Sequence, residues 1–437
     1  MSWKHWWQNM AIKTKRFISS RKSCSCSMPG VWRAVAYCEG MVVIFHSPRA
    51  CAHVARTMDI NSQYRSLADG RPEKVGSVPL LSSQLEEKHS IFGGVERLEQ
   101  CIAYAVEHYK PQCLAIANSC VAGVIGDDVN SVAVASEDKY GIPVLTVDCC
   151  GFLDGEYYQG YFDMTRQLLR RFIKPCAKEK DTVLLVGDNG GPWGHYATEV
   201  TRLLHKMGIK VIGQFPGYMK FSDLSKAGRA EAMIILGGRG NTYKGLHDIA
   251  EEMQQTLAMP YLDIYPVCWS ETQRWITAAG ELLHKEKEAQ IVLAEEQAAF
   301  TERLTQLQEV TRGKKTVLCI GRLLMYYHPK AVLETIRLLQ LDLTAIILLQ
   351  TYGERDKADM LAVVRQYSDV DVYDNVAGEP FLQEADIVLT THELQNKYLK
   401  QLFLPMLPKA GRAGEIEFME AVYRTLCSRI KGGLTYV

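Results

Sequence analysis

The sequence of 437 residues lacks any apolar run near the roughly 20 residues that a membrane-spanning helix needs. It also lacks an excess of either charge, because 50 Lys and Arg residues balance 50 Asp and Glu residues. Bulk charge therefore gives no attraction for nucleic acid or for an anionic lipid surface. The N-terminus is basic and rich in Trp but has no signal-peptide core. We therefore expect a cytoplasmic protein with no nucleic acid and no membrane as partner.

Compact C-x-x-C pairs are also missing, although the chain contains 13 cysteines. Their absence argues against a zinc ribbon and against a bacterial ferredoxin unit. Without an export signal a disulfide framework is not expected, because thiols stay reduced inside the cell. The cysteines are then either metal ligands or packed core thiols.

Short runs of Val, Ile and Leu alternate along the chain with segments of helical periodicity. Apolar runs of this length are typical of parallel strands that are covered on both faces by helices. The fold class predicted is α/β, with three Rossmann-like, doubly wound parallel-sheet domains. The expected strands include 113–117, 144–147, 183–186, 211–212, 233–236, 317–320, 345–349 and 387–390.

Two of these strands look like the start of new domains, because each follows charged residues and ends in Gly. A long charged helical stretch, about 281–310, precedes the second of them as a connector. The predicted division is an N-terminal arm at 1–23 and three domains at 24–175, 176–310 and 311–437. The three Trp residues of the arm favour contact with a partner over a disordered tail.

Three cysteines of the first domain lie in or beside turns rich in Gly, Pro and Ser. Cys51 follows Cys26 by 25 residues, and Cys120 follows Cys51 by 69 and comes directly after an expected strand. Ligands of α/β sheets gather at the carboxyl ends of strands. An iron–sulfur cubane is usually held by four thiolates, so three from one chain leave it one short. The missing ligand is expected from a partner chain, which makes this a shared interface cluster.

Further motifs accompany these cysteines in a fixed order. His46-Ser-Pro-Arg-Ala-Cys51 is followed by Phe92-Gly-Gly94, Ile125-Gly-Asp-Asp128 and Asp148-Cys-Cys-Gly-Phe152. The combination closely resembles the first domain of the nitrogenase component 1 superfamily. That superfamily includes nitrogenase subunits, their cofactor-assembly scaffold, protochlorophyllide-type tetrapyrrole reductases and methylthio-alkane reductases. The looser three-domain pattern extends the resemblance over most of the chain.

The resemblance implies that the cluster ligands are Cys26, Cys51 and Cys120. Cys24 is a rival for the first position, but Pro29-Gly30 follows Cys26 as in the turn of the family. Cys149 and Cys150 lie near the same end of the domain, where packing is the plainer interpretation. For Asp127 and Asp128, a role in docking and a role in capping the next helix stand equally open.

The resemblance also implies partners and a cofactor. The chain would pair with a homologous component 1 subunit in an α2β2 heterotetramer and take electrons from a homodimeric, ATP-dependent [4Fe–4S] reductase to act on a small-molecule substrate. The shared iron–sulfur cluster would be a P-cluster of the [8Fe–7S] type if each chain supplies three thiolates. It would be a [4Fe–4S] cluster if the partner supplies one. A larger iron–sulfur cofactor would then belong to the partner subunit.

The chain departs from catalytic nitrogenase subunits at two positions. The loop 237–241 contains no Cys, and the segment 404–411 contains no His, although the large cofactor of the family is held by such residues. By elimination we favour a subunit of a methylthio-alkane reductase, which cleaves a C–S bond. The alternatives are a scaffold for cofactor assembly, a tetrapyrrole reductase subunit, and an α/β protein whose cysteines are all structural.

Polar residues of the second and third domains are candidates for a substrate pocket. Each of them is more simply a hydrogen-bonded loop or core residue, and Cys268, beside Trp269, is an alternative metal ligand. These candidates are His195, Arg239, Cys268, Tyr326, Tyr327, His328 and His392.

Overall fold

The computed structural model describes most of the chain in two compact units. Unit 1 comprises residues 1–21, 265–277 and 289–437, and unit 2 comprises 22–264 and 278–288. Within these units the described residues are 17–18, 26–57, 76–149, 157–188, 195–237, 240–324, 327–405 and 408–435.

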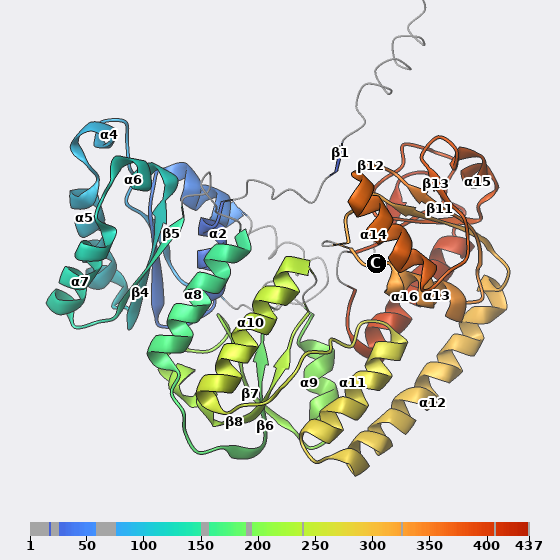
Figure 1. The fold of residues 1–437 in the computed structure, drawn as a ribbon, viewed down its shortest axis with the longest axis horizontal. Helices are drawn as coiled ribbons and strands as arrows, with labels where there is room; N and C mark the ends of the chain where they lie inside the picture. Colours follow the sequence, from blue (N-terminus) through green and yellow to red (C-terminus); the bar gives the residue numbers. More distant parts are fainter. Residues whose placement is uncertain are drawn as a thin grey trace, which may run out of the picture. The chain divides into compact units, whose positions relative to one another are not determined.

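Unit 2 begins with a four-stranded sheet in the order β3-β2-β4-β5, and every strand pair in it is parallel. The strands are β2 (Met41–His46), β3 (Leu80–Ser82), β4 (Cys113–Ser119) and β5 (Val144–Cys149). The helices around it are α2 (Met28–Val35), residues 49–57, α4 (His89–Phe92), α5 (Val95–Tyr109), α6 (Cys120–Ile125), α7 (Val129–Tyr140) and α8 (Tyr157–Phe172). Figure 1 shows α4 and α6 side by side at one end of this sheet.

Both faces of the first sheet are covered. Alternate residues of β2, such as Val43 and Phe45, pack in one core with α2 and α8. The residues between them, Val42 and Ile44, pack in a second core with α5 and α7. Successive side chains of a strand point to opposite faces, so helices on both sides bury every residue of β2 and β4.

The helices α2 and α8 approach each other through two glycines. A Cβ atom on Gly30 would lie 1.8 Å from the carbonyl oxygen of Tyr157, and one on Gly160 would lie 2.2 Å from that of Ser27. No side chain fits at either position, so the two backbones are in direct contact. This contact holds the start of α2, and Cys26 directly precedes that start.

A second parallel sheet of unit 2 has the order β7-β6-β8-β9. Its hydrophobic residues are continuous with one core of the first sheet, since a single cluster contains Leu168 of α8 together with Leu184 and Met233. The elements are β6 (Glu179–Val186), α9 (Thr198–Lys206), β7 (Lys210–Phe215), the 3-10 helix η1 (Phe221–Arg229), β8 (Ala230–Ile235), α10 (Gly240–Leu257) and β9 (Tyr261–Leu262).

Unit 1 contains a six-stranded parallel sheet in the order β13-β11-β10-β14-β15-β16. Its strands are β10 (Lys315–Ile320), β11 (Asp342–Leu348), β13 (Val372–Asp374), β14 (Ile387–Thr390), β15 (Gln401–Phe403) and β16 (Leu434–Thr435). Its helices are α13 (Lys330–Leu338), α14 (Glu354–Arg365), α15 (Glu379–Glu384) and α16 (Gly411–Cys427). Separately, β1 (Phe17–Ile18) pairs in parallel with β12 (Thr351–Tyr352).

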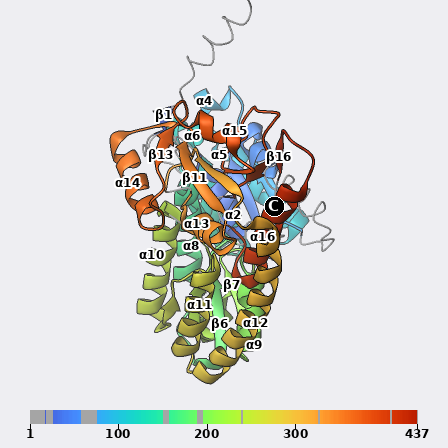
Figure 2. The same cartoon turned by 90° about the vertical axis from the view of Figure 1, so that its right-hand side faces the viewer.

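The connector predicted at about 281–310 corresponds to α12 (Glu286–Thr311), and a separate helix, α11 (Trp269–Leu282), precedes it. They run beside each other in Figures 1 and 2, and within unit 1 the rings of Trp269 and Phe300 stack with centroids 4.2 Å apart. His284 has a left-handed φ of 54° between them, and such a residue cannot continue a right-handed helix. A pattern of apolar periodicity does not detect a break of this length.

The predicted fold class is confirmed, since the three larger sheets are parallel and helices flank them. The eight expected strands all correspond to observed ones, and the structure adds further strands, including β2 in the centre of the first sheet. The domain boundaries at 176 and 311 stay a prediction. Of the N-terminal arm, only residues 17–18 are described, and they pair within the same chain.

Two glutamates lie in the interior of unit 1. Glu334 of α13 accepts hydrogen bonds from the backbone N–H and hydroxyl of Ser270, at 2.7 and 2.5 Å, and from the thiol of Cys268 at 3.3 Å. It therefore caps the first turn of α11 from another helix. Glu415 of α16 accepts a hydrogen bond of 2.7 Å from Thr335. The pKa of Glu415 is raised to about 8, mainly by burial; the Thr335 hydrogen bond lowers it in part, and the charge of Glu334 raises it.

The contact between α2 and α8 predicts the effect of a single methyl group. Gly160→Ala is expected to destabilise the protein by roughly 1–3 kcal/mol, because the new Cβ forces the two backbones apart. Gly76→Ala is the matched control, since no atom lies within 4 Å of the position a Cβ would take there. Denaturant unfolding of both variants tests this, and equal midpoints for the two would contradict the packing argument.

The buried Glu415 predicts how stability depends on pH. Its pKa is about 8 in the folded protein against an ordinary value of 4.5, so between these values the folded state keeps a proton that the unfolded state loses. Stability is therefore highest below the ordinary value and falls as pH rises towards 8. Glu415→Gln cannot ionise, so its stability relative to the wild type is expected to grow over this window, by a few kcal/mol at most. Unfolding midpoints at pH 5 and pH 8 measure this, and a constant difference would refute it.

Candidate metal centre

The three cysteines predicted as ligands are on three separate segments at one end of the first sheet. Cys26 precedes Ser27, the N-cap residue of α2. Cys51 lies in the helical residues 49–57 that follow β2, and Cys120 is the first residue of α6, directly after β4. Since β2 and β4 are parallel with His46 opposite Asn118, both strands end at the same edge of the sheet. Parallel pairing thus brings cysteines from distant parts of the chain to one edge.

The electrostatics show that the three thiols are neighbours. Burial raises the pKa of Cys26, the backbone of Met28 lowers it in part, and nearby Cys51 and Cys120 raise it further. Burial also raises the pKa of Cys51, where a hydrogen bond with Ser47 acts in the opposite direction and Cys120 raises it. Like charges close together disfavour ionisation, so Cys26 and Cys51 favour the protonated form unless a cation binds them.

The spacing of the sulfurs distinguishes between kinds of metal site. A single tetrahedral ion with metal–sulfur bonds of about 2.3 Å would hold its sulfurs about 4 Å apart. Among the described residues, the three cysteine sulfurs do not all lie within 4.8 Å of one another, so at least one pair of them is more widely spaced. Wider spacing, three thiols and exposure of Cys26 at the surface fit a polynuclear cluster that a second chain completes.

The remaining cysteines proposed for this end have different positions. Cys149 ends β5, is fully buried in the hydrophobic core, and donates its thiol to the carbonyl oxygen of Val147 at 3.6 Å. Cys24 and Cys150 lie outside the described residues.

A network of buried hydrogen bonds lies at the same edge of the sheet. The Nε2 atom of His46 lies 2.9 Å from Oδ2 of Asp127, and its Nδ1 atom lies 2.9 Å from Oγ of Ser83. Asp127 also accepts the backbone N–H of Gly94 at 2.9 and 3.1 Å. Burial lowers the pKa of His46, although hydrogen bonding to Asp127 raises it in part, so the imidazole is neutral near pH 7. Sequence reasoning did not identify this network, since no spacing pairs residue 46 with residue 127.

Of the two aspartates left open by the sequence, Asp128 is a helix cap. Its carboxylate accepts the backbone N–H of Ser131 at 3.0 Å and the hydroxyl of the same residue at 2.6 Å, at the first turn of α7. Asp127 has its carboxylate in the interior instead, with 3% of its side chain exposed.

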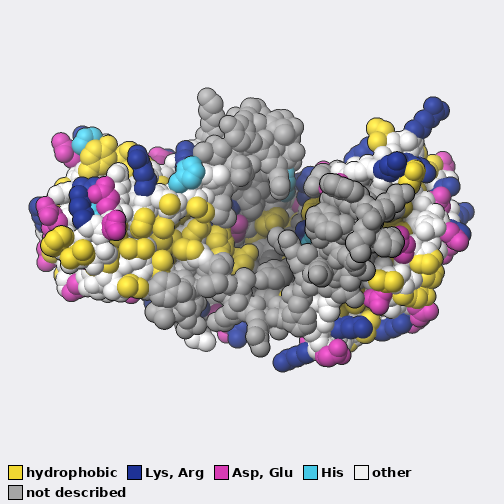
Figure 3. Space-filling model, turned by 90° about the horizontal axis from the view of Figure 1, so that it is seen from above, with side chains coloured by type: hydrophobic (Ala, Val, Ile, Leu, Met, Phe, Trp, Pro, Cys, Tyr) yellow, Lys and Arg dark blue, Asp and Glu magenta, His cyan; other side chains and the backbone are white. Residues whose placement is uncertain are grey.

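Large apolar side chains are exposed beside Cys120. Ile91 and Phe92 of α4 are 77% and 85% exposed, and Val124 of the neighbouring α6 is 72% exposed. Figure 3 looks down on this end of the first sheet, where hydrophobic side chains gather among scattered charged ones. We call Ile91, Phe92 and Val124 the apolar tip. Contiguous exposed apolar side chains are typical of surfaces that contact another protein.

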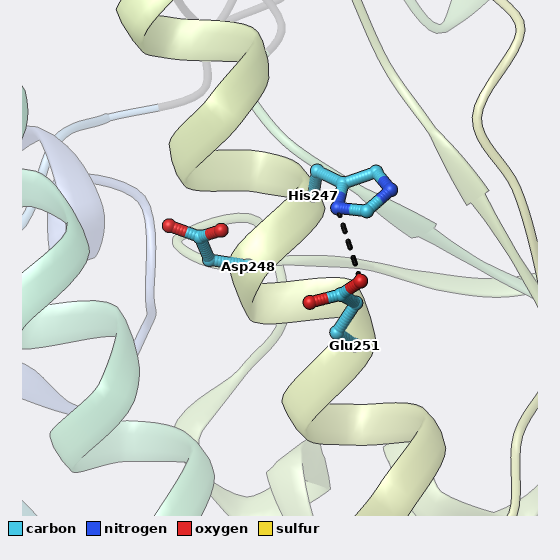
Figure 4. Close-up of side chains that lie close together, drawn as sticks. All are labelled: His247, Asp248 and Glu251. Atoms are coloured by element: carbon cyan, nitrogen blue, oxygen red, sulfur yellow. Dashed lines mark ion pairs between the residues drawn. The ribbon is translucent and has the colours of Figure 1, made fainter.

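The group of ligand atoms within 4.8 Å is His247, Asp248 and Glu251 on α10. Figure 4 shows His247 and Glu251 paired on one side of the helix and Asp248 directed to the other. The His247 Nδ1 atom lies 3.5 Å from Oε1 of Glu251, and its Nε2 atom lies 3.1 Å from the hydroxyl of Tyr261. Both ring nitrogens thus have protein partners, and the group reads as an ion pair on a helix surface.

The predicted pocket residues of unit 1 are dispersed. Burial and then the charge of Glu334 raise the pKa of Cys268 to about 12, although hydrogen bonds lower it in part, and so high a pKa makes it a structural thiol. His392 lies after β14 beside Arg322, which follows β10, and burial and this guanidinium both lower the pKa of His392. Nδ1 of His328 lies 3.2 Å from the backbone N–H of Lys330.

In the same unit Tyr327 is buried. In unit 2, His195 is partly buried ahead of α9. Arg239 and Tyr326 lie outside the described residues. None of the described helices combines the length and apolar character needed to cross a bilayer.

Comparison with known proteins adds a family. The sequence model described as nitrogenase component 1 type oxidoreductase matches residues 26–425. A nitrogenase iron-molybdenum cofactor biosynthesis protein NifE of Clostridium pasteurianum is 28% identical over 305 residues, which cover 66% of this chain and 63% of that protein. A nitrogenase molybdenum-iron protein alpha chain of Methanosarcina barkeri is 22% identical over 290 residues, covering 64% of this chain and 52% of its own length. The chain therefore spans about half to two thirds of the length of these relatives.

The fold also matches a solved structure. The structure of nitrogenase Cp1 at pH 5 superimposes with a TM-score of 0.64 over 92% of this chain and 88% of that chain, at 17% identity. This likeness establishes a shared fold.

Proposed function

Because the chain belongs to the nitrogenase component 1 type oxidoreductase family, we propose that it is one subunit of a two-component, ATP-dependent reductase. In this proposal Cys26, Cys51 and Cys120 hold an iron–sulfur cluster that is shared with a homologous partner subunit in an α2β2 heterotetramer. When bound, such a cluster supplies one-electron transfer.

The observation that carries the proposal is the convergence of three thiols at one sheet edge. Cys51 and Cys120 both raise the pKa of Cys26, and Cys120 also raises the pKa of Cys51, so the three thiols are close enough to interact electrostatically. Cys26 is exposed, while Cys51 and Cys120 are half-buried, so the site opens to the surface on one side. Three thiolates from each of two chains suit an [8Fe–7S] cluster, and three plus one suit a [4Fe–4S] cluster.

The apolar tip supports the second partner. A homodimeric [4Fe–4S] reductase that uses MgATP would dock on Ile91, Phe92 and Val124, which are exposed next to Cys120. Burying these side chains drives association without a charged contact. Docking there would bring the reductase close to the cysteines, as electron transfer requires.

For the substrate, we propose reductive cleavage of a methylthio-alkane. Two electrons and two protons break one C–S bond, and the products are a thiol and a small hydrocarbon. The loop 237–241 and the segment 404–411 lack the Cys and His that would hold a large cofactor, so such a cofactor would belong to the partner subunit. A tetrapyrrole reductase subunit is the alternative enzyme.

A second candidate function is a scaffold on which a nitrogenase-type cofactor is assembled. The description of relatives from Clostridium pasteurianum and from a Nostoc strain as cofactor biosynthesis proteins favours it. Anaerobically purified complex with its reductase and MgATP tests both candidates. Release of thiol and hydrocarbon from a thioether supports the reductase, whereas no turnover together with a cofactor that can be transferred to another protein supports the scaffold.

The ligand assignment predicts the effect of removing one thiol. Cys51→Ala is expected to abolish the visible absorption of anaerobically purified protein and to weaken pairing with the partner subunit. Cys427→Ala is the matched control, because that thiol is exposed at the end of α16 in unit 1. Full colour in Cys51→Ala, or equal loss in both variants, would count against the assignment.

The apolar tip predicts the effect of truncating its largest side chain. Phe92→Ala is expected to weaken reductase binding about 10- to 100-fold, because burying a Phe side chain stabilises a complex by about 1.5–3 kcal/mol. Tyr398→Ala, which removes a 69% exposed aromatic side chain in unit 1, is expected to leave binding unchanged. Titration of the reductase against each variant measures this, and unchanged affinity in Phe92→Ala would exclude the tip as the docking surface.

A further inference from the structure

We propose that Asp127 and His46 are positioning residues that hold the apolar tip in a fixed place relative to the two segments that carry Cys51 and Cys120. This rests on the proposed function, because it assigns a role in reductase docking and electron delivery. Neither residue would touch the cluster or the reductase. With side chains 0% and 3% exposed, His46 and Asp127 can act only through the groups that they bind.

Three segments meet at this pair. His46 ends β2, five residues before Cys51, and Asp127 follows α6, which begins at Cys120. Gly94 is two residues after Phe92, the last residue of α4, and it donates its backbone N–H to both carboxylate oxygens of Asp127, at 2.9 and 3.1 Å. The backbone just after the tip is therefore hydrogen-bonded to Asp127, which is itself hydrogen-bonded to His46 in the segment ahead of Cys51.

The proton positions in this chain of hydrogen bonds follow from its chemistry. An ionised carboxylate only accepts, so Nε2 of His46 carries the proton that is donated to Asp127. Nδ1 then accepts from the hydroxyl of Ser83, whose oxygen accepts the backbone N–H of Ser47 at 3.2 Å. A neutral imidazole supplies one donor and one acceptor, as this arrangement needs. Every polar atom of the pair thus has a partner, and buried groups of this kind are costly to leave unpaired.

Steric exclusion supports the same arrangement. A Cβ atom on Gly94 would lie 2.4 Å from Cδ2 of Leu85, 2.6 Å from Oδ2 of Asp127 and 3.2 Å from Cε1 of His46. The backbone at residue 94 can approach the carboxylate only because it has no side chain. The backbone at Gly94, just after the tip, is therefore in close contact with the pair as well as hydrogen-bonded to it.

A graded series of variants tests this. Asp127→Asn keeps the hydrogen bonds if the imidazole changes tautomer, because the amide oxygen accepts from Gly94 and the amide nitrogen donates to Nε2. Asp127→Ala leaves the N–H of Gly94 and one nitrogen of His46 without partners. Asp128→Ser is the matched control, since it removes the adjacent charge while retaining an N-cap oxygen for α7.

The first measurement is amide hydrogen exchange of the peptide that contains residues 91–98, in metal-free full-length protein. Asp127→Ala is expected to speed exchange about tenfold, and Asp127→Asn and Asp128→Ser are expected to stay near the wild type. If Asp127→Ala does not fold, Ser83→Ala serves as the milder variant, with a rise of a few fold expected. An exchange rate equal to that of the wild type in Asp127→Ala, or in Ser83→Ala if it is used instead, would overturn the proposal. An equal rise in the exchange rates of Asp127→Asn and Asp127→Ala would overturn it as well.

The second measurement compares two electron donors. In Asp127→Ala, reduction of the cluster by the protein reductase with MgATP is expected to show a raised KM for the reductase. Reduction of the cluster by dithionite is expected to keep the wild-type rate. Equal slowing with both donors would overturn the positioning role. The hydrogen-exchange measurement needs neither iron nor reductase. If anaerobically purified wild-type protein contains no cluster, the proposed function is refuted, and the exchange rates still test whether Asp127 and His46 position the tip.

Discussion

The parallel pairing of β2 with β4 is the constraint on which the candidate site depends. The register places His46 opposite Asn118 and therefore ends both strands at one edge of the sheet. Parallel strands require crossover connections, and these carry the residues between Cys51 and Cys120 around the sheet and back. A shift of one residue would exchange the β2 side chains of one core with those of the other, so packing in the two cores fixes the register.

The third cysteine is positioned by helix packing. Cys26 precedes α2, and α2 is held on α8 by backbone contact at Gly30 and Gly160. The site thus depends on two kinds of interaction, strand pairing for two thiols and close helix packing for the third. Both are rigid, which suits a centre whose ligands must keep their places when the charge of a bound metal changes.

Fold and family leave open whether this chain reduces a substrate or supports assembly of a cofactor. The same architecture and the same thiols serve either role, because function depends on what a site binds and what docks beside it. The exposed apolar tip and the buried His46–Asp127 pair are informative for this reason. In the proposals above, both features act on the approach of a second protein, since the tip is exposed and the pair is buried beneath it in the sequence segments that flank the cysteines.

The amino-acid sequence by itself determined the α/β class, the strands of the cores and the family resemblance, and it led to the prediction of Cys26, Cys51 and Cys120 as ligands. These follow from local periodicity and from motifs that are contiguous in the chain. Only the tertiary structure decided that Asp127 is a buried partner of His46 while its neighbour Asp128 caps α7. It also showed the turn at His284 between α11 and α12, and the exposure of Phe92. Burial and long-range hydrogen bonds depend on segments that are far apart in sequence, and no local pattern contains that information.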